Sequence, residues 1–253
     1  MGVKYDCEIF NPGEYDDNNI DKMQISMIPE GSRVLEIGCA TGFMSEYLVK
    51  TKKCFVFGVE SRKEEAEAAG ARCDKIICGR IDSPGVEDEL DAYCEKSGGF
   101  DVVFMSQVIE HIAFPEDVLL KIKNWLSDSG SLVVSSCNVA YWESRFRLLA
   151  GIWEYEEFGI FDNTHLRFFT VISFRKMLER CGYRIVDEKF HLNDIDLIWF
   201  IPPLRRFVAD RFSLRPSTML GLLPLVGRGL RKRYINRFKN LIAFQFVYKA
   251  EKG

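Results

Sequence analysis

Short apolar runs alternate with amphipathic stretches along most of the chain. The apolar runs are rich in β-branched and aromatic residues, which is typical of buried strands, and the stretches between them repeat apolar residues at helical spacing. Strands are predicted at 33–37, 54–59, 75–78, 100–105, 131–136, 183–190 and 241–249, and helices at 42–50, 62–69, 86–96, 115–125 and 171–181. This alternation predicts an α/β fold with a doubly wound, mostly parallel seven-stranded sheet. The last strand is expected to be antiparallel, because its apolar and polar residues alternate.

The pattern indicates one domain with three additions. Residues 1–29 are polar and turn-rich and are expected to form a flap over a ligand site. Residues 30–137 would make the ligand-binding half of the domain, and residues 170–253 its second half. Between the halves, residues 138–169 are rich in aromatic side chains and lack a clean period, which is more typical of a functional lid than of a linker. Residues 191–240 interrupt the second half as a basic insertion.

A glycine turn follows the first predicted strand. Gly38 and Gly42 lie between this strand and the next helix, where the absence of a Cβ lets the backbone approach a ligand closely. The second strand ends at Glu60, and an acid there can hold the two hydroxyls of a ribose. These features predict a nucleoside-bearing cofactor. The turn lacks the dinucleotide spacing G-x-G-x-x-G, and Glu36 just before it would repel a pyrophosphate but could orient an ammonium or sulfonium group.

The run E-I-G-C-A-T-G at residues 36–42 resembles motif I of the class I S-adenosylmethionine-dependent methyltransferases. The resemblance implies a Rossmann-like fold, S-adenosylmethionine as cofactor and methyl transfer as the reaction. Ligands bind at the carboxyl ends of parallel strands, so residues 106 and 107 should face the cofactor. Arg80 stands where relatives often carry an aspartate, so Asp82 is expected to serve the adenine side. The predicted cofactor-binding residues are Glu36, Gly38, Cys39, Gly42, Glu60, Ser61, Asp82, Ser106 and Gln107.

Five further stretches narrow the resemblance to one branch. They are V-I-E-H-I at 108–112, S-C-N-V-A-Y-W at 136–142, R-L-L-A-G at 147–151, D-N-T-H-L-R-F-F-T at 162–170 and N-L-I-A-F-Q-F-V at 240–247. They are similar to methyltransferase-23-like proteins often encoded among bacterial cell-surface glycan genes, although Cys137 replaces a usual proline. The resemblance implies O-methylation of a sugar hydroxyl on a glycan or on a nucleotide- or lipid-linked sugar intermediate.

Two histidines are the candidates for catalysis of such a transfer. An alcohol must lose its proton as the new bond forms, and a neutral imidazole is the natural base near pH 7. His111 follows the fourth predicted strand, and His165 lies among the aromatic residues of the lid. We predict general-base catalysis by these residues, with a capping, packing or tethering role as the alternative. The predicted substrate-binding residues are Glu110, Asn138, Tyr141, Trp142 and Arg167.

Two other functions stay open. Gln107, Glu110, His111 and His165 resemble the E-x-x-E-H…H metal site of small-RNA terminal 2′-O-methyltransferases and, less closely, that of quinone O-methyltransferases. This implies a divalent ion that lowers the pKa of the acceptor hydroxyl. Because Gln107 replaces a charged ligand, catalysis without a metal is favoured. The third function is a non-catalytic cofactor-binding scaffold, against which the intact glycine turn and Glu60 argue.

Charge and cysteine usage add expectations about location. The chain has a net charge of -3, but residues 201–253 carry 12 Lys and Arg against 2 acidic residues. Arginines interleaved with Leu, Val and Phe between 203 and 237 predict peripheral contact with an anionic membrane, ahead of a solvated face, a dimer surface or nucleic acid. Eight cysteines without a C-x-x-C pair predict reduced thiols. We therefore expect a cytoplasmic protein at the inner face of the membrane.

Overall fold

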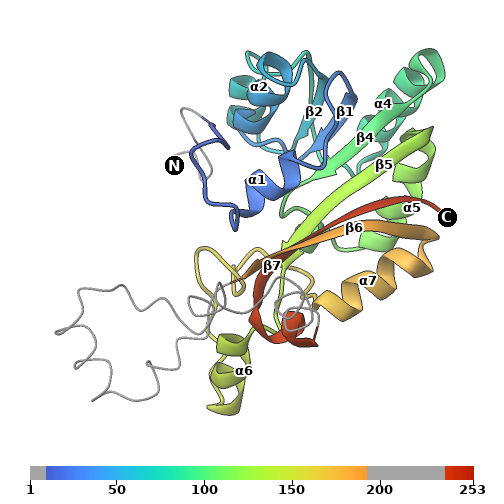
Figure 1. Cartoon of the computed structure of the whole chain (residues 1–253). Coiled ribbons are helices and arrows are strands. Elements are labelled where there is room, and N and C mark those ends of the chain that lie inside the picture. The colour runs from blue at the N-terminus through green and yellow to red at the C-terminus, as the bar shows by residue number, and fades with distance from the viewer. Residues whose placement is uncertain (1–9, 193–236) are drawn as a thin grey trace.

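The structure is a computed structural model that describes residues 10–192 and 237–253, and its centre is a seven-stranded sheet (Figure 1). The strands are β1 (Arg33–Ile37), β2 (Phe55–Glu60), β3 (Lys75–Cys78), β4 (Phe100–Met105), β5 (Leu126–Cys137), β6 (Tyr183–Leu192) and β7 (Ala243–Lys252). They lie in the order β3-β2-β1-β4-β5-β7-β6. Neighbours from β3 to β5 are parallel, and β7 is antiparallel to both β5 and β6. The predicted fold class, including the antiparallel last strand, is confirmed.

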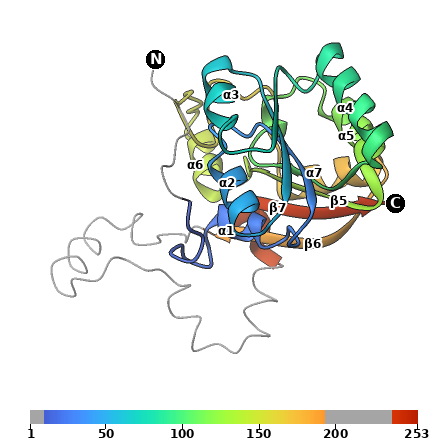
Figure 2. The same cartoon turned by 90° about the horizontal axis from the view of Figure 1, so that it is seen from above.

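Helices cover both faces of this sheet (Figure 2). On one face lie α1 (Ile20–Ile25) and α2 (Phe43–Lys50), with α3 (Lys63–Ala69) next to α2. On the other face lie α4 (Pro84–Ser97), α5 (Pro115–Trp125) and α7 (Val171–Arg180). A 3₁₀ turn, η1 (Ile109–His111), follows β4, and α6 (Trp142–Leu149) lies between β5 and α7. No helix in the described parts of the chain is long and apolar enough to cross a membrane.

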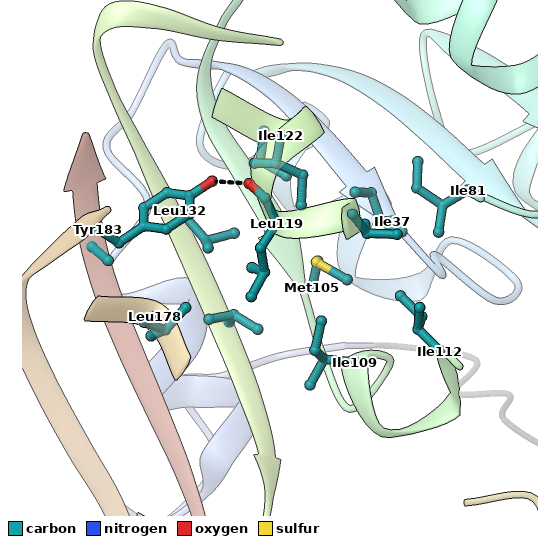
Figure 3. Packing of buried hydrophobic residues seen from close by; sticks show 14 of the residues in the cluster. Ile37, Ile81, Met105, Ile109, Ile112, Leu119, Ile122, Leu132, Leu178 and Tyr183 are labelled. Carbon is teal, nitrogen blue, oxygen red and sulfur yellow. Dashed lines mark hydrogen bonds between the residues drawn. The ribbon is translucent and has the colours of Figure 1, made fainter. Parts of the chain in front are cut away.

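The central strands are buried on both faces, so alternate residues enter two cores. Val103 and Met105 of β4 pack with α4, α5 and α7, whereas Val102 and Phe104 pack with α1 and α2. In the larger core the Tyr183 hydroxyl donates to a backbone carbonyl of α5 at 2.7 Å, which satisfies its polar group (Figure 3). This packing makes a rigid base for the loops at the carboxyl ends of the strands.

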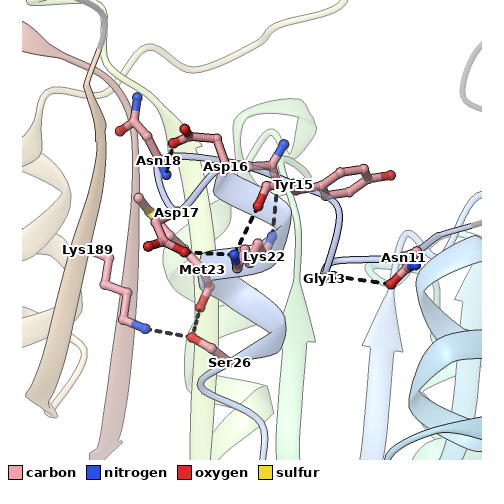
Figure 4. A network of polar contacts seen from close by, with 11 residues as sticks. Asn11, Gly13, Tyr15, Asp16, Asp17, Asn18, Lys22, Met23, Ser26 and Lys189 are labelled. Carbon is pink, nitrogen blue, oxygen red and sulfur yellow. Dashed lines mark hydrogen bonds and ion pairs between the residues drawn. The ribbon is translucent and has the colours of Figure 1, made fainter.

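The described part of the predicted N-terminal flap is fastened to the edge of the sheet. Asn18 holds both backbone groups of Leu192 at the end of β6, at 2.7 and 2.9 Å. Lys189 of β6 donates to the Ser26 hydroxyl at 2.6 Å (Figure 4). Residue 19 caps α1 through its side chain, so the helix begins at a defined place. These contacts hold α1 over the carboxyl end of β4, where Gln24 reaches the loop after the strand.

The predicted lid differs from expectation because it contains a helix. The sequence pattern predicts no regular element in 138–169, yet α6 forms within it. Trp142 and Phe146 are in ring contact at 6.1 Å, and Glu143 pairs with Arg147 at 3.1 Å. Both pairs have the i, i+4 spacing that stabilises a short helix, but the surrounding aromatic residues obscure the period in the sequence. The predicted basic insertion, 191–240, falls mostly on residues 193–236, which lie outside the described residues.

Candidate functional site

The glycine turn after β1 is tied to the end of β2. Gly38 and Gly42 have φ angles of 73° and 77°, in the left-handed region that glycine adopts without steric cost. The amides of Gly38 and Cys39 donate to the carbonyl of Val59 at 2.7 and 3.3 Å. Ala40 also has a positive φ, of 49°, which is uncommon for a residue with a side chain. The turn is therefore held in one strained shape at the carboxyl edge of the sheet.

Glu60 at the end of β2 is fixed against the same turn. One carboxylate oxygen accepts from the amide of Ala40 at 3.0 Å, and the other accepts from the amide of Arg62 at 2.9 Å and from the Ser61 hydroxyl at 3.2 Å. A carboxylate has about four lone-pair sites, so one remains for a ribose hydroxyl, and a second opens when the Ser61 hydroxyl turns away. The predicted ribose-binding acid is thus held in place, with its neighbour Ser61 as support. The turn and this acid together fit a nucleoside-bearing cofactor.

Glu36 stands near the end of β1 as predicted, but its side chain is not exposed to a ligand. Its side chain is buried beneath the turn, and the Ser45 hydroxyl of α2 donates to it. Burial raises the pKa of Glu36 to about 8, so the carboxyl group is largely protonated at neutral pH. The expected role as an anion beside a sulfonium group does not fit a neutral, buried carboxyl group. Glu36 instead ties β1 to α2 under the turn.

The remaining predicted cofactor residues also have partners within the protein. Ser106 accepts a hydrogen bond from Gln24 of α1 at 3.0 Å. The Gln107 amide donates to Ser135 at 2.8 Å and accepts from the Cys137 thiol at 3.2 Å, so this side chain points into the protein. The φ of Gln107 is 54°, which marks the loop after β4 as a second strained point of the same edge.

Asp82 lies in the loop after β3 and is paired with Arg80. The two bonds of this fork are 2.9 and 2.8 Å, and the guanidinium group lowers the pKa of Asp82 below its usual range. Both side chains are at the surface, so the pair can open at little cost. The expected contact of Asp82 with the adenine side of the cofactor stays a prediction.

The Gly38→Ala variant tests the close approach at the turn. A Cβ on residue 38 would lie 2.4 Å from a methyl group of Val108, in a backbone conformation that L residues rarely adopt. We expect the free energy of unfolding to fall by about 2 to 4 kcal/mol from strain and overpacking together. Gly31→Ala is the matched control, because its φ is 71° and nothing lies within 4 Å of the added Cβ. Equal losses in urea titrations of the two variants would show that Val108 simply moves aside.

Three predicted residues converge beyond the end of β4. Glu110 and His111 belong to η1, and His165 comes from the lid. One ligand atom of each, a carboxylate oxygen or a ring nitrogen, lies within 4.8 Å of the others. The backbone carbonyl of Glu110 accepts from the amides of residues 166 and 167 at 2.9 and 3.0 Å, which fastens the lid to η1. The structure thus brings together both candidate bases and one predicted substrate residue.

The hydrogen bonds of the two imidazoles define their orientation. Nδ1 of His165 is 3.2 Å from the carbonyl oxygen of Ile160, and Nδ1 of His111 is 3.2 Å from that of Thr164. A carbonyl oxygen only accepts, so both bonds require the proton on Nδ1. In the neutral rings the lone pair is therefore on Nε2, the atom that can take a proton or hold a metal ion. Backbone carbonyls thus hold both imidazoles in the tautomer whose Nε2 can accept a proton or bind a metal ion.

Glu110 is a buried acid beside these rings. Its side chain is 1% exposed, and neither oxygen makes a close hydrogen bond to any described residue. Burial raises the pKa of Glu110 to about 7, and weak donation from its own backbone amide, the Ser136 hydroxyl and the Cys137 amide offsets this only in part. A buried carboxylate without a close donor is costly unless a proton or a cation neutralises it. The group is therefore placed to share a proton with an imidazole or to hold a cation.

The other predicted substrate residues divide into two groups. Arg167 borders the same recess as Glu110 and His165, and its guanidinium group donates to the carbonyl of Ala113. Asn138 is fully buried, and within the described part of the chain its side chain binds only backbone groups, among them the carbonyl of Ala243 at 2.7 Å. For Asn138 the expected contact with substrate is thus replaced by a structural tie at the base of the lid.

Two aromatic residues of the lid are likewise used for packing. Tyr141 is 3% exposed and contacts Phe244 with ring centroids 5.5 Å apart. Trp142 packs on Tyr141 at 5.4 Å within the same small cluster. The predicted contact of Tyr141 with substrate does not match its burial in the lid's own core, whereas Trp142 is half-buried there and its predicted contact with substrate stays a prediction.

Sequence reasoning missed the residues that position His165. Asp162 is buried, and its carboxylate accepts from the amide and hydroxyl of Thr164 at 2.8 and 2.5 Å. The Asp-x-Thr spacing is the signal that could have revealed this turn, because an aspartate often binds its own backbone two residues on. Thr164 in turn presents its oxygens to His111. The run from 162 to 165 thus aligns both rings.

Comparison with known proteins gives three kinds of match. The family model described as "Methyltransferase domain" matches residues 17–188. (S)-coclaurine N-methyltransferase of Papaver somniferum is 29% identical over 113 residues, which cover 44% of this chain and 31% of that protein. Ubiquinone biosynthesis O-methyltransferase of Caulobacter sp. (strain K31) is 29% identical over 109 residues, 43% of this chain and 42% of that protein. Each match thus spans less than half the length of the relative.

Among solved structures, a SAM dependent methyltransferase from Archaeoglobus fulgidus is similar with a TM-score of 0.56. The similarity covers 91% of this chain and 90% of that chain at 17% sequence identity. At that identity the likeness shows a shared fold and nothing finer.

Proposed function

This chain belongs to the family described as "Methyltransferase domain", and from that premise we propose that it is an S-adenosylmethionine-dependent methyltransferase that methylates a hydroxyl group of a sugar. The acceptor would be a cell-surface glycan or a nucleotide- or lipid-linked sugar intermediate. The five stretches that resemble the glycan-associated branch support this acceptor class. The O-methyltransferase activity is supported by one observation above all, which is the convergence of Glu110, His111 and His165 beside the end of β4.

The convergence matters because hydroxyl groups need a proton acceptor. An alcohol keeps its proton at neutral pH and becomes a good nucleophile only as a base removes it, whereas a neutral amine already carries its lone pair. Nε2 of His165 carries no proton in the tautomer that Ile160 imposes, and the ring borders the recess with Arg167. We assign it as the base that takes the acceptor's proton, with His111 and Glu110 beside it to stabilise the charge that develops.

The chain's own residues would also hold the reactants in line. S-adenosylmethionine, when bound, supplies a methyl group on a sulfonium. Glu60 and the glycine turn would fix the nucleoside end of the cofactor, and the segment after β4 lies beside the turn at Val108 and beside the lid at Glu110. Alignment of this kind contributes up to about 7 to 11 kcal/mol in favourable cases. The lid, fastened to η1, would exclude water from the acceptor.

A second candidate is metal-assisted O-methylation of an acceptor with adjacent hydroxyls, such as a quinone-like molecule or an RNA end. It is favoured by the donor set, since two imidazoles with Nδ1 bound to carbonyls and one buried carboxylate are typical of a divalent-metal site. Glu110, His111 and His165 would hold the ion, which would lower the pKa of the acceptor hydroxyl. Gln107 lies outside this set, because its side chain binds Ser135 and Cys137.

Metal removal separates the two candidates. We expect the purified protein, incubated with cofactor carrying a labelled methyl group and an extract of its source cells, to keep its activity after dialysis against a chelator. The reason is that an imidazole base needs no ion. Activity lost by about tenfold or more on chelation and restored by Mg²⁺, Mn²⁺ or Zn²⁺ would instead establish the metal-assisted mechanism.

Mass analysis of the labelled product tests the acceptor. A methyl group on a sugar-containing product supports the proposed substrate class, whereas a labelled quinone-like molecule or RNA end supports the second candidate. Calorimetric titration without any heat of binding for S-adenosylmethionine would contradict both. The proposed contact of residues 203–237 with an anionic membrane stays a prediction, because almost all of that segment lies outside the described residues.

A further inference from the structure

Two cysteine sulfurs meet above Gly58 in the middle of β2. A Cβ built on Gly58 would lie 2.9 Å from the sulfur of Cys39 and 3.1 Å from that of Cys73. Cys39 belongs to the glycine turn after β1, and Cys73 follows α3, so the two residues come from separate crossovers of the sheet. The missing side chain at position 58 therefore makes one small space that holds both thiols.

The two thiols lie against the same unfilled Cβ position, and they differ in exposure. The Cys39 sulfur also lies 3.9 Å from the carbonyl oxygen of Ala40. Cys39 is 2% exposed, whereas Cys73 is half-buried. The proximity of the two thiols lowers the pKa of Cys73 and raises that of Cys39. Cys73 is thus the accessible and more nucleophilic member, and Cys39 is the buried partner within reach.

We propose that Cys39 and Cys73 are a redox-sensitive dithiol that a hydroperoxide converts to a disulfide, and that this bond weakens cofactor binding. The thiolate of Cys73 attacks the peroxide oxygen and releases the alcohol, which leaves a sulfenic acid on Cys73. The sulfur of Cys39 then attacks the Cys73 sulfur, the disulfide forms and water leaves. Overall, two thiols and one hydroperoxide give one disulfide, one alcohol and one water. A dithiol reductant reverses the change.

The location of Cys39 connects this bond to the site. A disulfide is about 2.05 Å long, so the segments that carry Cys39 and Cys73 are drawn toward each other as the bond forms. The amide of Ala40, the next residue, holds the Glu60 carboxylate at 3.0 Å. Movement of the turn therefore displaces the acid assigned to the ribose. This consequence rests on the function proposed above, whereas formation of the disulfide does not.

Three other described cysteines have different surroundings. The thiols of Cys54 and Cys94 donate to backbone carbonyls, of Pro29 at 3.4 Å and of Trp125 at 3.7 Å respectively. Cys78 is exposed at the end of β3. Oxidation of Cys78 is expected to give a sulfenic or sulfinic acid on that residue and no disulfide, which makes Cys78 the matched control.

The experiment treats the full chain with tert-butyl hydroperoxide, blocks remaining thiols and maps the tryptic peptides. Trypsin places Cys39 in 34–50 and Cys73 in 73–75, each with one cysteine. We expect these two peptides to be joined, with the loss of two hydrogen atoms. Affinity for S-adenosylhomocysteine, measured by calorimetry, should fall about tenfold or more and return with dithiothreitol.

Two variants complete the test. In Cys73→Ala the link and the loss of affinity should both disappear, whereas Cys78→Ala should behave as the wild type. The proposal would be overturned if Cys39 and Cys73 carry the blocking reagent after oxidation, which would mean that both thiols stayed reduced, or if either is linked to another cysteine. Unchanged affinity for S-adenosylhomocysteine in the linked protein would also overturn it. Should the reduced protein bind no S-adenosylhomocysteine, the proposed function fails, and the peptide map still decides whether the dithiol closes.

Discussion

His165→Ala is expected to lower kcat for methyl transfer by about 100-fold or more while affinity for S-adenosylhomocysteine stays within about twofold. The substitution removes the imidazole that lines the recess with Glu110 and Arg167, so the acceptor's proton has no preset receiver. The cofactor residues of the turn and β2 are untouched. Transfer of a labelled methyl group to the acceptor in cell extract gives the rate, and calorimetry gives the affinity.

The control for this variant is His191→Ala. His191 is also a histidine at the carboxyl edge of the sheet, but its Nδ1 lies 2.9 Å from the amide oxygen of Gln245. We expect its rate to fall by less than about threefold, since no proton transfer is assigned to it. Added imidazole should restore part of the activity of His165→Ala if the ring acts as a base. Full activity in His165→Ala would remove the residue from the mechanism.

The cofactor side of the site follows from the sequence because its geometry is local. A strand, a turn with Gly38 and Gly42, a helix and a second strand ending at Glu60 leave the chain little freedom. The structure places the acid against the turn, where it accepts from the amide of Ala40. The fold class was equally accessible, because the period of the apolar residues changes with each element.

The acceptor side depends on contacts between distant segments, which spacing alone does not determine. Sequence reasoning named His111 and His165, but their meeting depends on the lid amides that bind the carbonyl of Glu110. The tautomer of each ring is set by a backbone carbonyl that no motif reveals. Asn138 and Tyr141 show the same limit, since a polar or aromatic residue in a lid can face substrate or its own core. Only the fold decides which.

Glu36 shows how burial changes the chemistry of a residue whose position was predicted correctly. Its carboxyl group lies between β1 and α2, and its nearest donor, Ser45, is nine residues away in the sequence. Desolvation outweighs that hydrogen bond, and the pKa rises from 4.5 to about 8. A motif can mark the residue but not its protonation state, and the protonation state has a measurable consequence.

Glu36→Gln is expected to change the pH dependence of stability. The folded state binds the Glu36 proton more tightly than the unfolded state, so this group stabilises the fold fully below about pH 4.5 and loses that contribution as pH rises through about 8. The variant cannot ionise at this position. Between about pH 5 and pH 8 the wild type should therefore lose about 3 to 4 kcal/mol of unfolding free energy relative to the variant.

The two stability curves should also cross. At pH 5 the variant is expected to be less stable by about 1 to 3 kcal/mol, because the introduced amide brings two N–H donors into a space built for a carboxyl group. At pH 8 the folded wild type either holds a buried carboxylate, which loses hydration, or keeps a proton that the unfolded state has released. Both lower its free energy of unfolding, and neither occurs in the variant. Urea titrations of the cofactor-free proteins measure both differences. Glu64→Gln, at an exposed site of α3, should follow the wild type throughout. Parallel curves for the wild type and Glu36→Gln would mean that Glu36 is already ionised in the fold, and a cation-orienting role at the turn would then be restored.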